Sequence, residues 1–148
     1  MTLPAVRPRL IEGGLHVDAR GTVAFVNDFG FEGVDRFYIV RSHCPYEPRG
    51  WVGHQREQKW FFVVQGTSLI AVVKPDHWQS PASNLPVERF VLFAARPQIL
   101  CVPPGYATGS TNLTGDATVM IFSSGRIEDA KTDDYRFAVD TWPIVERG

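Results

Sequence analysis

The sequence has little of three features that define whole classes of protein: cysteine, net charge and long apolar runs. It contains two cysteines among 148 residues, too few for the disulfide framework of a small secreted domain. The formal net charge is −1, which provides no electrostatic basis for binding nucleic acid. No run of about 18 apolar residues occurs, and a membrane-spanning helix needs such a run. We therefore expect a globular protein that binds neither nucleic acid nor membrane.

The length of the chain predicts one domain that covers residues 1–148. Residues 1–7 lack the apolar segment of a secretory signal, so we expect a cytoplasmic protein. Cys44 and Cys101 both lie in apolar, strand-like contexts. We expect both to be buried free thiols rather than a bridge or a nucleophile.

Short strands dominate the pattern, and no segment shows a long helical period. Alternating, β-branched and aromatic runs predict strands at 22–27, 36–41, 59–64, 67–74, 87–93, 98–102 and 117–123. The pair Gln65-Gly66 predicts a hairpin turn between strands 59–64 and 67–74. Residues 75–85 are expected to form a loop, and 125–132 could hold one helical turn. About eight to eleven short strands separated by turns predict an all-β jelly roll or barrel.

Two stretches carry a more specific spacing. The first contains Val52-Gly-His54, then Lys59 and Gly66, and the second is Pro103-Pro-Gly-Tyr-Ala-Thr-Gly-Ser-Thr-Asn112. These spacings resemble the two motifs of the cupin superfamily, HxH-x4-E-x6-G and PxG-x2-H-x3-N. Cupins are double-sheet jelly rolls, so the resemblance implies a cupin jelly-roll barrel with little helix.

The metal ligands of that pattern are mostly replaced. A metal-binding cupin would have His, His, Glu and His where this chain has Val52, His54, Lys59 and Thr108. Only His54 is a competent ligand, and one imidazole cannot complete a tetrahedral or octahedral shell. We therefore expect no metal and no other cofactor.

His54 and Lys59 are the candidate catalytic pair. Positions i and i+2 of a strand share a face, so Val52 and His54 should project the same way, and the cupin frame implies that Lys59 points into the same interior. Histidine is suited to proton transfer near neutral pH. A lone buried ammonium is costly and needs an anion beside it. The alternatives are a hydrogen-bonded structural histidine and a surface lysine on an edge strand.

The chain also resembles one group of metal-free cupins, the dTDP-4-dehydrorhamnose 3,5-epimerase family. Residues 49–55 and 58–66 are similar to its RGLHxQ stretch and to the lysine at the head of the following strand. Residues 103–109 are similar to its PxGFAHGF stretch, and residues 18–21 to its early DxRG. Residues 133–137 also look like the neighbouring dTDP-sugar 3,4-ketoisomerases.

The resemblance implies a reaction that needs no metal. A histidine base removes the proton beside the C4 ketone, a lysine stabilises the enolate, and a tyrosine returns a proton from the other face. Lys59 matches the family lysine, whereas the family base falls on Val52, so His54 is expected to substitute for it. Tyr106 is the expected acid, and Tyr38 and Tyr135 are open alternatives.

The remaining site expectations concern binding. Arg49 matches the arginine of the family's RG pair and is expected to contact phosphate bidentately. The other expected substrate contacts and anion-binding candidates are Arg20, Arg56, Trp51 and Thr108. Asp133-Asp134 is expected to form a solvated turn, because adjacent strand residues point to opposite faces.

The resulting prediction is a metal-independent epimerase or isomerase of a nucleotide-linked (dTDP) 4-keto-6-deoxy sugar. One alternative is a catalytically silent cupin that binds a sugar or nucleotide-sugar. The other is a dTDP-sugar 3,4-ketoisomerase. In each case the partner is a nucleotide-sugar, and the resemblance implies a homodimer.

Overall fold

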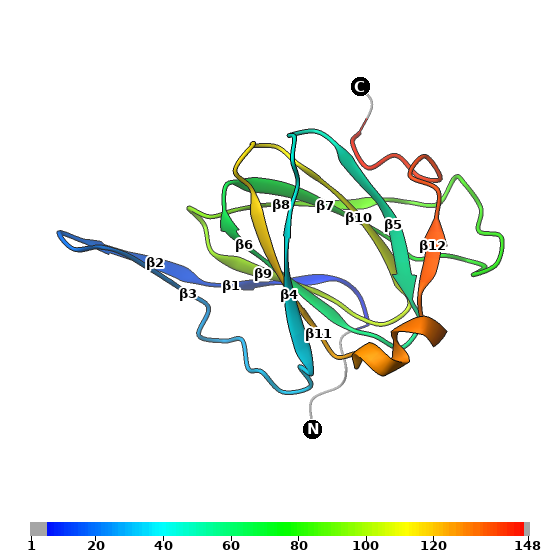
Figure 1. Cartoon of the computed structure of the whole chain (residues 1–148), viewed down its shortest axis with the longest axis horizontal. Helices are drawn as coiled ribbons and strands as arrows, with labels where there is room; N and C mark the ends of the chain where they lie inside the picture. Colours follow the sequence, from blue (N-terminus) through cyan, green and yellow to red (C-terminus); the bar gives the residue numbers. More distant parts are fainter. Residues whose placement is uncertain (1–5, 147–148) are drawn as a thin grey trace.

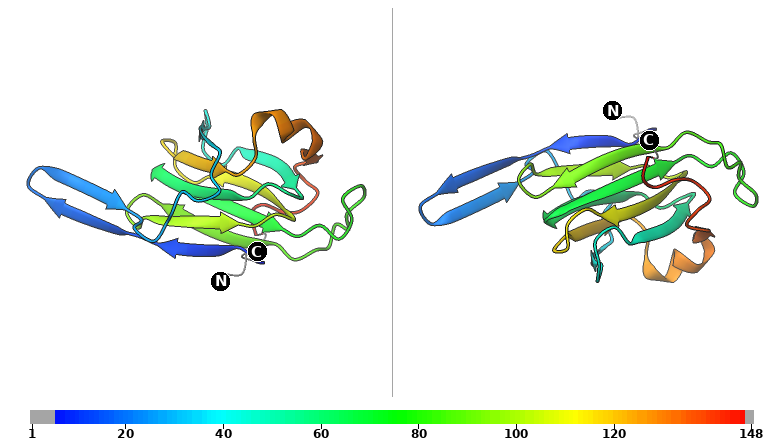
Figure 2. Two further views of the ribbon diagram at one scale, coloured as in Figure 1. Left: turned by 90° about the horizontal axis from the view of Figure 1, so that it is seen from below. Right: turned by 90° about the horizontal axis from the view of Figure 1, so that it is seen from above.

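A computed structural model describes residues 6–146 of the chain, so residues 1–5, where the expected absence of a secretory signal partly falls, lie outside the description. Two five-stranded sheets face each other, and a two-stranded ribbon projects from one end (Figures 1 and 2). The strands are β1 (Arg9–Glu12), β2 (Gly14–Asp18), β3 (Gly21–Phe25), β4 (Arg36–Arg41), β5 (Pro48–His54), β6 (Lys59–Gln65), β7 (Thr67–Val73), β8 (Glu88–Phe93), β9 (Gln98–Val102), β10 (Tyr106–Asn112), β11 (Thr118–Ser123) and β12 (Tyr135–Phe137).

The strand order is β1-β9-β6-β11-β4 in the first sheet and β12-β5-β10-β7-β8 in the second. Every paired strand is antiparallel to its neighbour. The prediction of an all-β fold is confirmed, with twelve strands in the described residues, slightly more than expected. One 3-10 helix, η1 (Ile127–Thr132), forms within the segment predicted to hold a helical turn.

The predicted hairpin across Gln65-Gly66 is wrong. Strand β6 pairs with β9 and β11 in the first sheet, whereas β7 pairs with β8 and β10 in the second. The chain therefore crosses between the sheets at Gly66, which has a φ of 72°, and a Cβ there would collide with Thr114 and Asp116. A local turn signal identified the bend but not which sheet the next strand would join.

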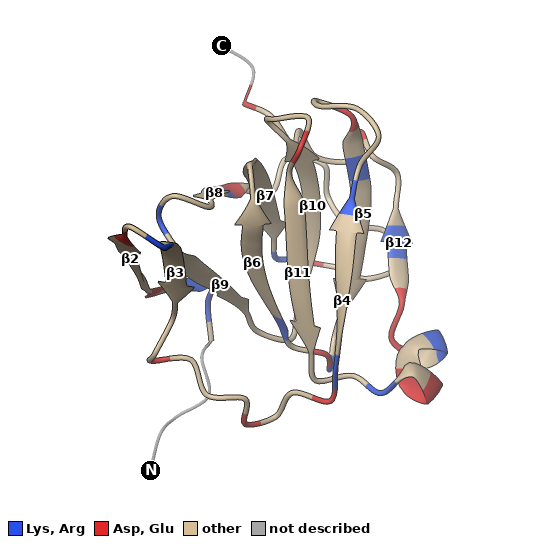
Figure 3. Cartoon of the chain, turned by 60° about the vertical axis from the view of Figure 1, so that its left-hand side comes forward, with Lys and Arg blue, Asp and Glu red and all other residues tan. Residues whose placement is uncertain are grey.

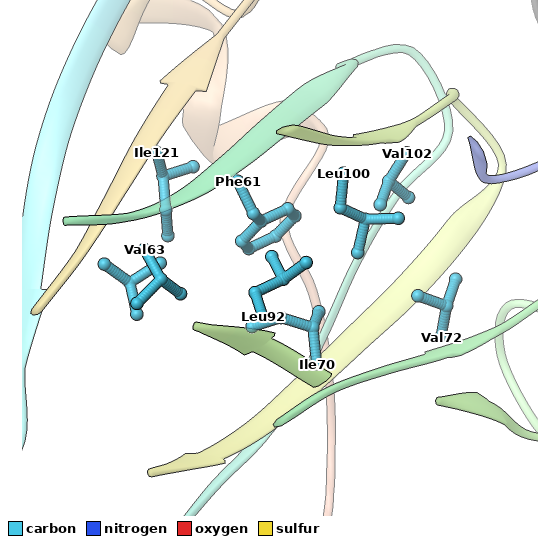
Figure 4. Packing of buried hydrophobic residues seen from close by; sticks show 9 residues of the cluster. Phe61, Val63, Ile70, Val72, Leu92, Leu100, Val102 and Ile121 are labelled. Atoms are coloured by element: carbon cyan, nitrogen blue, oxygen red, sulfur yellow. The ribbon is translucent and has the colours of Figure 1, made fainter. Parts of the chain in front are cut away.

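The main apolar cluster fills the space between β6, β9 and β11 on one side and β7 and β8 on the other (Figure 4). Each fully buried aliphatic side chain there contributes about 1.5–3 kcal/mol. The cluster consists of Phe61, Val63, Ile70, Val72, Leu92, Leu100, Val102, Val119 and Ile121.

Two smaller clusters cover the outer faces of the sheets. Trp51 and Trp142 anchor the one on the second sheet, and Trp60 and Cys101 belong to the one on the first sheet. Cys101 is buried and free as predicted, but Cys44 is exposed, because it lies in the loop before β5. Within residues 6–146, no helix has the length and apolar character needed to cross a membrane.

Candidate active site

A cavity of about 360 Å³ opens between the two sheets and adjoins the apolar cluster, whose Phe61, Ile70 and Ile121 line part of it. Its walls come mainly from β4, β6 and β11 of the first sheet and from β5 and β10 of the second. The polar and charged residues that line it are Arg36, Tyr38, Arg49, His54, Glu57, Lys59, Thr108, Ser110, Asn112, Asp134 and Arg136. The cavity therefore combines these polar groups with apolar side chains of the core.

Strand alternation decides which residues reach this cavity. On β5, Val52 and His54 line it, while Trp51 lies on the opposite face. Lys59 begins β6 and lines the same cavity. Thr108 pairs directly with Val52 across β10 and β5. All four positions that correspond to cupin metal ligands therefore line the same cavity.

The side chains at these positions do not fit a divalent metal. Val52 offers no donor atom, Thr108 offers a hydroxyl, and Lys59 places an ammonium beside the cavity. No group of three or more His, Cys, Asp or Glu residues is placed to hold a metal ion within residues 6–146. Protein sites for zinc and related metals need three or four such ligands.

The turn between β5 and β6 is held by Asp133, which directly follows η1. Its carboxylate accepts the backbone N–H groups of Gln55, Arg56 and Glu57 at 2.8, 3.0 and 2.9 Å. Asp133 is buried, so the expectation that Asp133-Asp134 forms a solvated turn is wrong for its first member. A buried carboxylate that accepts three charge-assisted hydrogen bonds rigidly shapes the segment that carries His54.

His54 is oriented by the backbone carbonyl oxygen of Asp133, which lies 2.6 Å from Nδ1. A carbonyl oxygen can only accept, so Nδ1 carries the hydrogen and Nε2 of the neutral ring has a free lone pair. The side chain is 12% exposed. Burial lowers the pKa of His54, the positive charge of Lys59 lowers it further, and the negative charge of Glu57 opposes both. The resting ring is therefore a neutral proton acceptor.

Glu57 is the site residue that sequence reasoning missed as a functional group. Its Oε1 accepts hydrogen bonds from Ser123 Oγ at 2.7 Å and Arg36 Nη2 at 3.1 Å. Its Oε2 lies 3.1 Å from His54 Nε2 and 3.8 Å from Lys59 Nζ. The contact with His54 lacks hydrogen-bond geometry, and neither atom has a hydrogen-bond partner among the described residues. Buried polar atoms without a partner are rare in folded proteins and call for an explanation.

The cavity carries an excess of positive charge. Four positive and two negative side chains line it, a net charge of +2 with His54 neutral. Arg36 is paired with Glu57, and Arg136 with Asp134 at 3.2 Å. Arg49 on β5 and Arg136 on β12, the strands with blue bands in Figure 3, also line an adjoining cavity of about 410 Å³. This arrangement suits an anionic ligand.

Tyr38 on β4 is the tyrosine that lines the cavity. Its ring centre lies 5.2 Å from the Arg36 guanidinium and 5.9 Å from Lys59 Nζ. It pairs in register with Ile121 of β11, which also lines the cavity. The expected acid, Tyr106, does not line the cavity, and its hydroxyl donates to the carbonyl oxygen of Val6. Burial raises the pKa of Tyr106.

Three further predicted contacts lie away from the cavity. Trp51 is 1% exposed and packs edge-to-face on Trp142 in the outer cluster, because it lies on the face of β5 opposite Val52 and His54. Arg20 lies at the tip of the β2–β3 ribbon, and its hydrogen bond holds the pKa of Asp18 below the usual range. Arg56 lines a different cavity. Trp51, Arg20 and Arg56 therefore do not line the main cavity.

Comparison with solved structures identifies the fold. The rmlC epimerase of Mycobacterium tuberculosis superposes with a TM-score of 0.72 and 21% identity over 92% of this chain and 71% of that one. ChmJ, a 3'-monoepimerase from Streptomyces bikiniensis in complex with dTDP-quinovose, superposes with a TM-score of 0.70 and 22% identity over 89% of this chain and 70% of that one. QdtA, a sugar 3,4-ketoisomerase from Thermoanaerobacterium thermosaccharolyticum in complex with TDP, superposes with a TM-score of 0.67 and 16% identity over 87% of both chains.

The fold is a cupin jelly roll. No protein-family model matches the chain, and no curated protein matches its sequence. At these identities the similarity establishes the architecture alone, as predicted from the motif spacing. The chemistry of the site has to be argued from its own residues.

Proposed function

We propose that this protein is a metal-independent isomerase or epimerase of a nucleotide-linked 4-keto-6-deoxy sugar, with dTDP as the expected nucleotide. The supporting observation is the buried His54 ring, whose Nδ1 is anchored to a backbone carbonyl oxygen and whose Nε2 has no hydrogen-bond partner among the described residues, in a cavity that Lys59 also lines. A fixed neutral imidazole next to a fixed ammonium is the arrangement that proton abstraction beside a ketone requires.

The reaction would begin with removal of the proton on the carbon next to the ketone. His54 Nε2 takes this proton, and the electron pair of the C–H bond moves to the ketone oxygen, forming an enolate. Lys59 Nζ, 3.8 Å from Glu57, lies where its positive charge would stabilise that oxygen. Removing a preorganised partner of a developing oxyanion typically costs a factor of about 10²–10³ in kcat.

The anionic end of the substrate is assigned to the arginine side of the cavity. Arg49 and Arg136 line both the main cavity and the adjoining one, where Arg41 and His43 add further basic groups. Guanidinium groups bind phosphate oxygens bidentately. We therefore place the diphosphate at this side and the sugar ring between His54 and Tyr38.

Epimerisation needs a proton donor on the face opposite the base, and Tyr38 is the proposed donor in place of Tyr106. Its support is its place in the cavity wall beside Lys59. A 3,4-ketoisomerase, by contrast, can move a proton between adjacent carbons with one base. The presence of one imidazole, with Val52 and Thr108 at the other motif positions, favours this second candidate enough to test it directly.

Contact with solvent would let the abstracted proton exchange. His54 and Glu57 also line a second cavity of about 340 Å³, whose other walls include Arg126 and Asp129. Isotope from solvent should therefore reach the substrate during turnover. A silent binding protein would have no need for a buried histidine with an unpartnered nitrogen.

The test is to incubate the protein with dTDP-4-keto-6-deoxyglucose in deuterated water and to follow the sugar by NMR. Deuterium at C3 or C5 supports an epimerase, and a 3-keto product supports the ketoisomerase. If neither appears while dTDP binding is measurable by calorimetry, the enzyme proposal is wrong and the silent cupin is favoured.

The matching variant is His54→Gln, which keeps a polar side chain but removes the base. We expect turnover to fall by about 10²–10⁴-fold, with His16→Gln on the exposed ribbon as the control. Retained turnover in His54→Gln would remove His54 from the role of base.

We also propose that the protein is a homodimer formed through β4. This strand is at the edge of the first sheet and exposes Phe37 (61%) and Ile39 (43%). Unprotected apolar edge strands pair readily with another copy. Sedimentation should show a dimer that Phe37→Lys weakens and Val91→Lys, on the exposed face of edge strand β8, does not. A monomeric wild type would contradict this.

A cytoplasmic location is part of the same proposal. Cys44 and Cys101 are both free thiols, as is usual in a reducing compartment. Cell fractionation with an antibody to the chain tests it directly, and recovery in an exported fraction would contradict it.

A further inference from the structure

Glu57 is held far more tightly than a surface carboxylate. Its backbone N–H donates to Asp133, and its Oε1 accepts from Ser123 and Arg36. Its side chain is 6% exposed. These contacts satisfy one oxygen completely and leave Oε2 fixed beside His54 Nε2 at 3.1 Å. The fold therefore maintains a buried negative charge at one defined place.

The geometry of this pair is informative because it is not a hydrogen bond. In the neutral ring Nε2 is an acceptor, and a carboxylate oxygen is also an acceptor, so no bond can form between them. Since the pair lacks hydrogen-bond alignment, the Nε2 lone pair is not directed along the line to Oε2. Nε2 is itself buried, and its lone pair accepts from no donor among the described residues.

The interaction changes character once the ring is protonated. When Nε2 takes the substrate proton, the C–H bond breaks, an N–H bond forms, and the ring becomes positively charged. At 3.1 Å the Glu57 carboxylate then attracts the ring strongly in this buried environment. An interaction that becomes favourable only as the proton moves accelerates the step.

We propose that Glu57 is the positioning residue that makes His54 an effective base, by stabilising the imidazolium that forms when Nε2 takes the substrate proton. This inference rests on the proposed function for its catalytic consequence. It also explains how a site with Val52 and Thr108 at two of the motif positions can work with one histidine. The positive charge of Lys59, 3.8 Å from the same oxygen, has the opposite effect and lowers the pKa of the His54 ring.

The test is the titration of the His54 ring by NMR in the free protein, which needs no turnover and so stands apart from the proposed reaction. The signal is assigned with His54→Gln. In Glu57→Gln, the lost negative charge should lower the pKa of His54 by about one to three units. Lys59→Met should move it in the opposite direction. Glu12→Gln is the matched control, because Glu12 also contacts an arginine and a glutamine, but outside the cavity.

The kinetic consequence is measured on the same variants. Glu57→Gln should lower kcat about 10- to 100-fold with little change in KM, and should move the acidic limb of the pH profile of kcat/KM downward. If Glu57→Gln does not fold, Glu57→Asp retains the charge at a greater distance and should lower the pKa of His54 by a smaller amount. An unchanged or raised pKa of His54 in a folded Glu57 variant overturns the inference. A lowered pKa without any turnover in the wild type would contradict the proposed function alone.

Discussion

The space between the two sheets has two halves that are built from the same strands but differ in content. The half between β6, β9 and β7, β8 is filled with aliphatic and aromatic side chains. The half toward β4, β5 and β10 is hollow and carries charges of both signs, and cluster residues of β6 and β11 form the boundary between the two halves. On β6 alone, Val63 belongs to the filled half and Lys59 to the hollow half.

The difference shows that strand periodicity determines the face of a side chain but not its role. Lys59 and Val63 share a face because their separation is even. Val63 contributes to stability by burial, whereas the buried positive charge of Lys59 requires the negative charge of Glu57 nearby. We therefore expect substitutions in the filled half to change mainly stability, and substitutions in the hollow half to change mainly activity.

The largest expected effect on stability comes from Leu100→Ala in the filled half. Leu100 is fully buried, and truncation leaves a cavity in a packed cluster, so the free energy of unfolding should fall by about 2–5 kcal/mol. Urea denaturation measures this. Leu15→Ala on the exposed ribbon is the control and should change stability by less than about 0.5 kcal/mol. A small effect at Leu100 would show that the filled half is not tightly packed.

Lys59→Met tests the hollow half. The turnover defined above should fall by about 10²–10³-fold. The unfolding free energy should stay unchanged or rise, because an apolar side chain of similar volume replaces a buried charge and Glu57 keeps Arg36 as its partner. Lys74→Met, on an exposed position after β7, is the control. A large loss of stability without loss of turnover would show that Lys59 contributes to stability and not to activity.

Asp133→Ala is expected to lower both stability and activity. It leaves three backbone N–H groups without their acceptor, so we expect a destabilisation of about 1–3 kcal/mol. Activity should fall as well, since the carbonyl oxygen of the same residue orients His54. Thermal unfolding and turnover are measured together, with Asp129→Ala in η1 as the control. Unaltered stability would show that the turn holds its shape without Asp133.

The smallest expected effect is a pH dependence of stability that comes from His54. Its pKa in the folded protein is lowered from 6.5 by burial, so the unfolded chain binds more protons below about pH 6.5. Stability should therefore fall as the pH falls through that window, with a slope of at most about 1.4 kcal/mol per pH unit. Urea titrations between about pH 5 and 8 should show that His54→Gln removes this slope. An identical slope in both proteins would contradict the assignment.

The local pattern was sufficient for seven of the twelve described strands but did not predict β1, β2, β5, β10 and β12. Strand alternation did predict the shared face of Val52 and His54. The motif resemblance implied that Val52, His54 and Lys59 face one interior, and these residues line one cavity together with Thr108. Local signals were insufficient at Gly66, where the turn leads into the opposite sheet, and at Cys44, where an apolar context did not imply burial. They also did not distinguish Tyr106 from Tyr38, since both lie on strands.

The sequence by itself determined the strand periodicity, the glycine and proline positions of the turns, and the replacement of metal ligands, because each of these depends on residues close together in the chain. Only the tertiary structure decided the electrostatics of the site. Asp133 meets the backbone of Gln55 and Glu57 across more than 70 residues, and Arg36 reaches Glu57 from another strand. Contacts that distant in sequence leave no local pattern, and they set both the orientation of His54 and the charge that surrounds it.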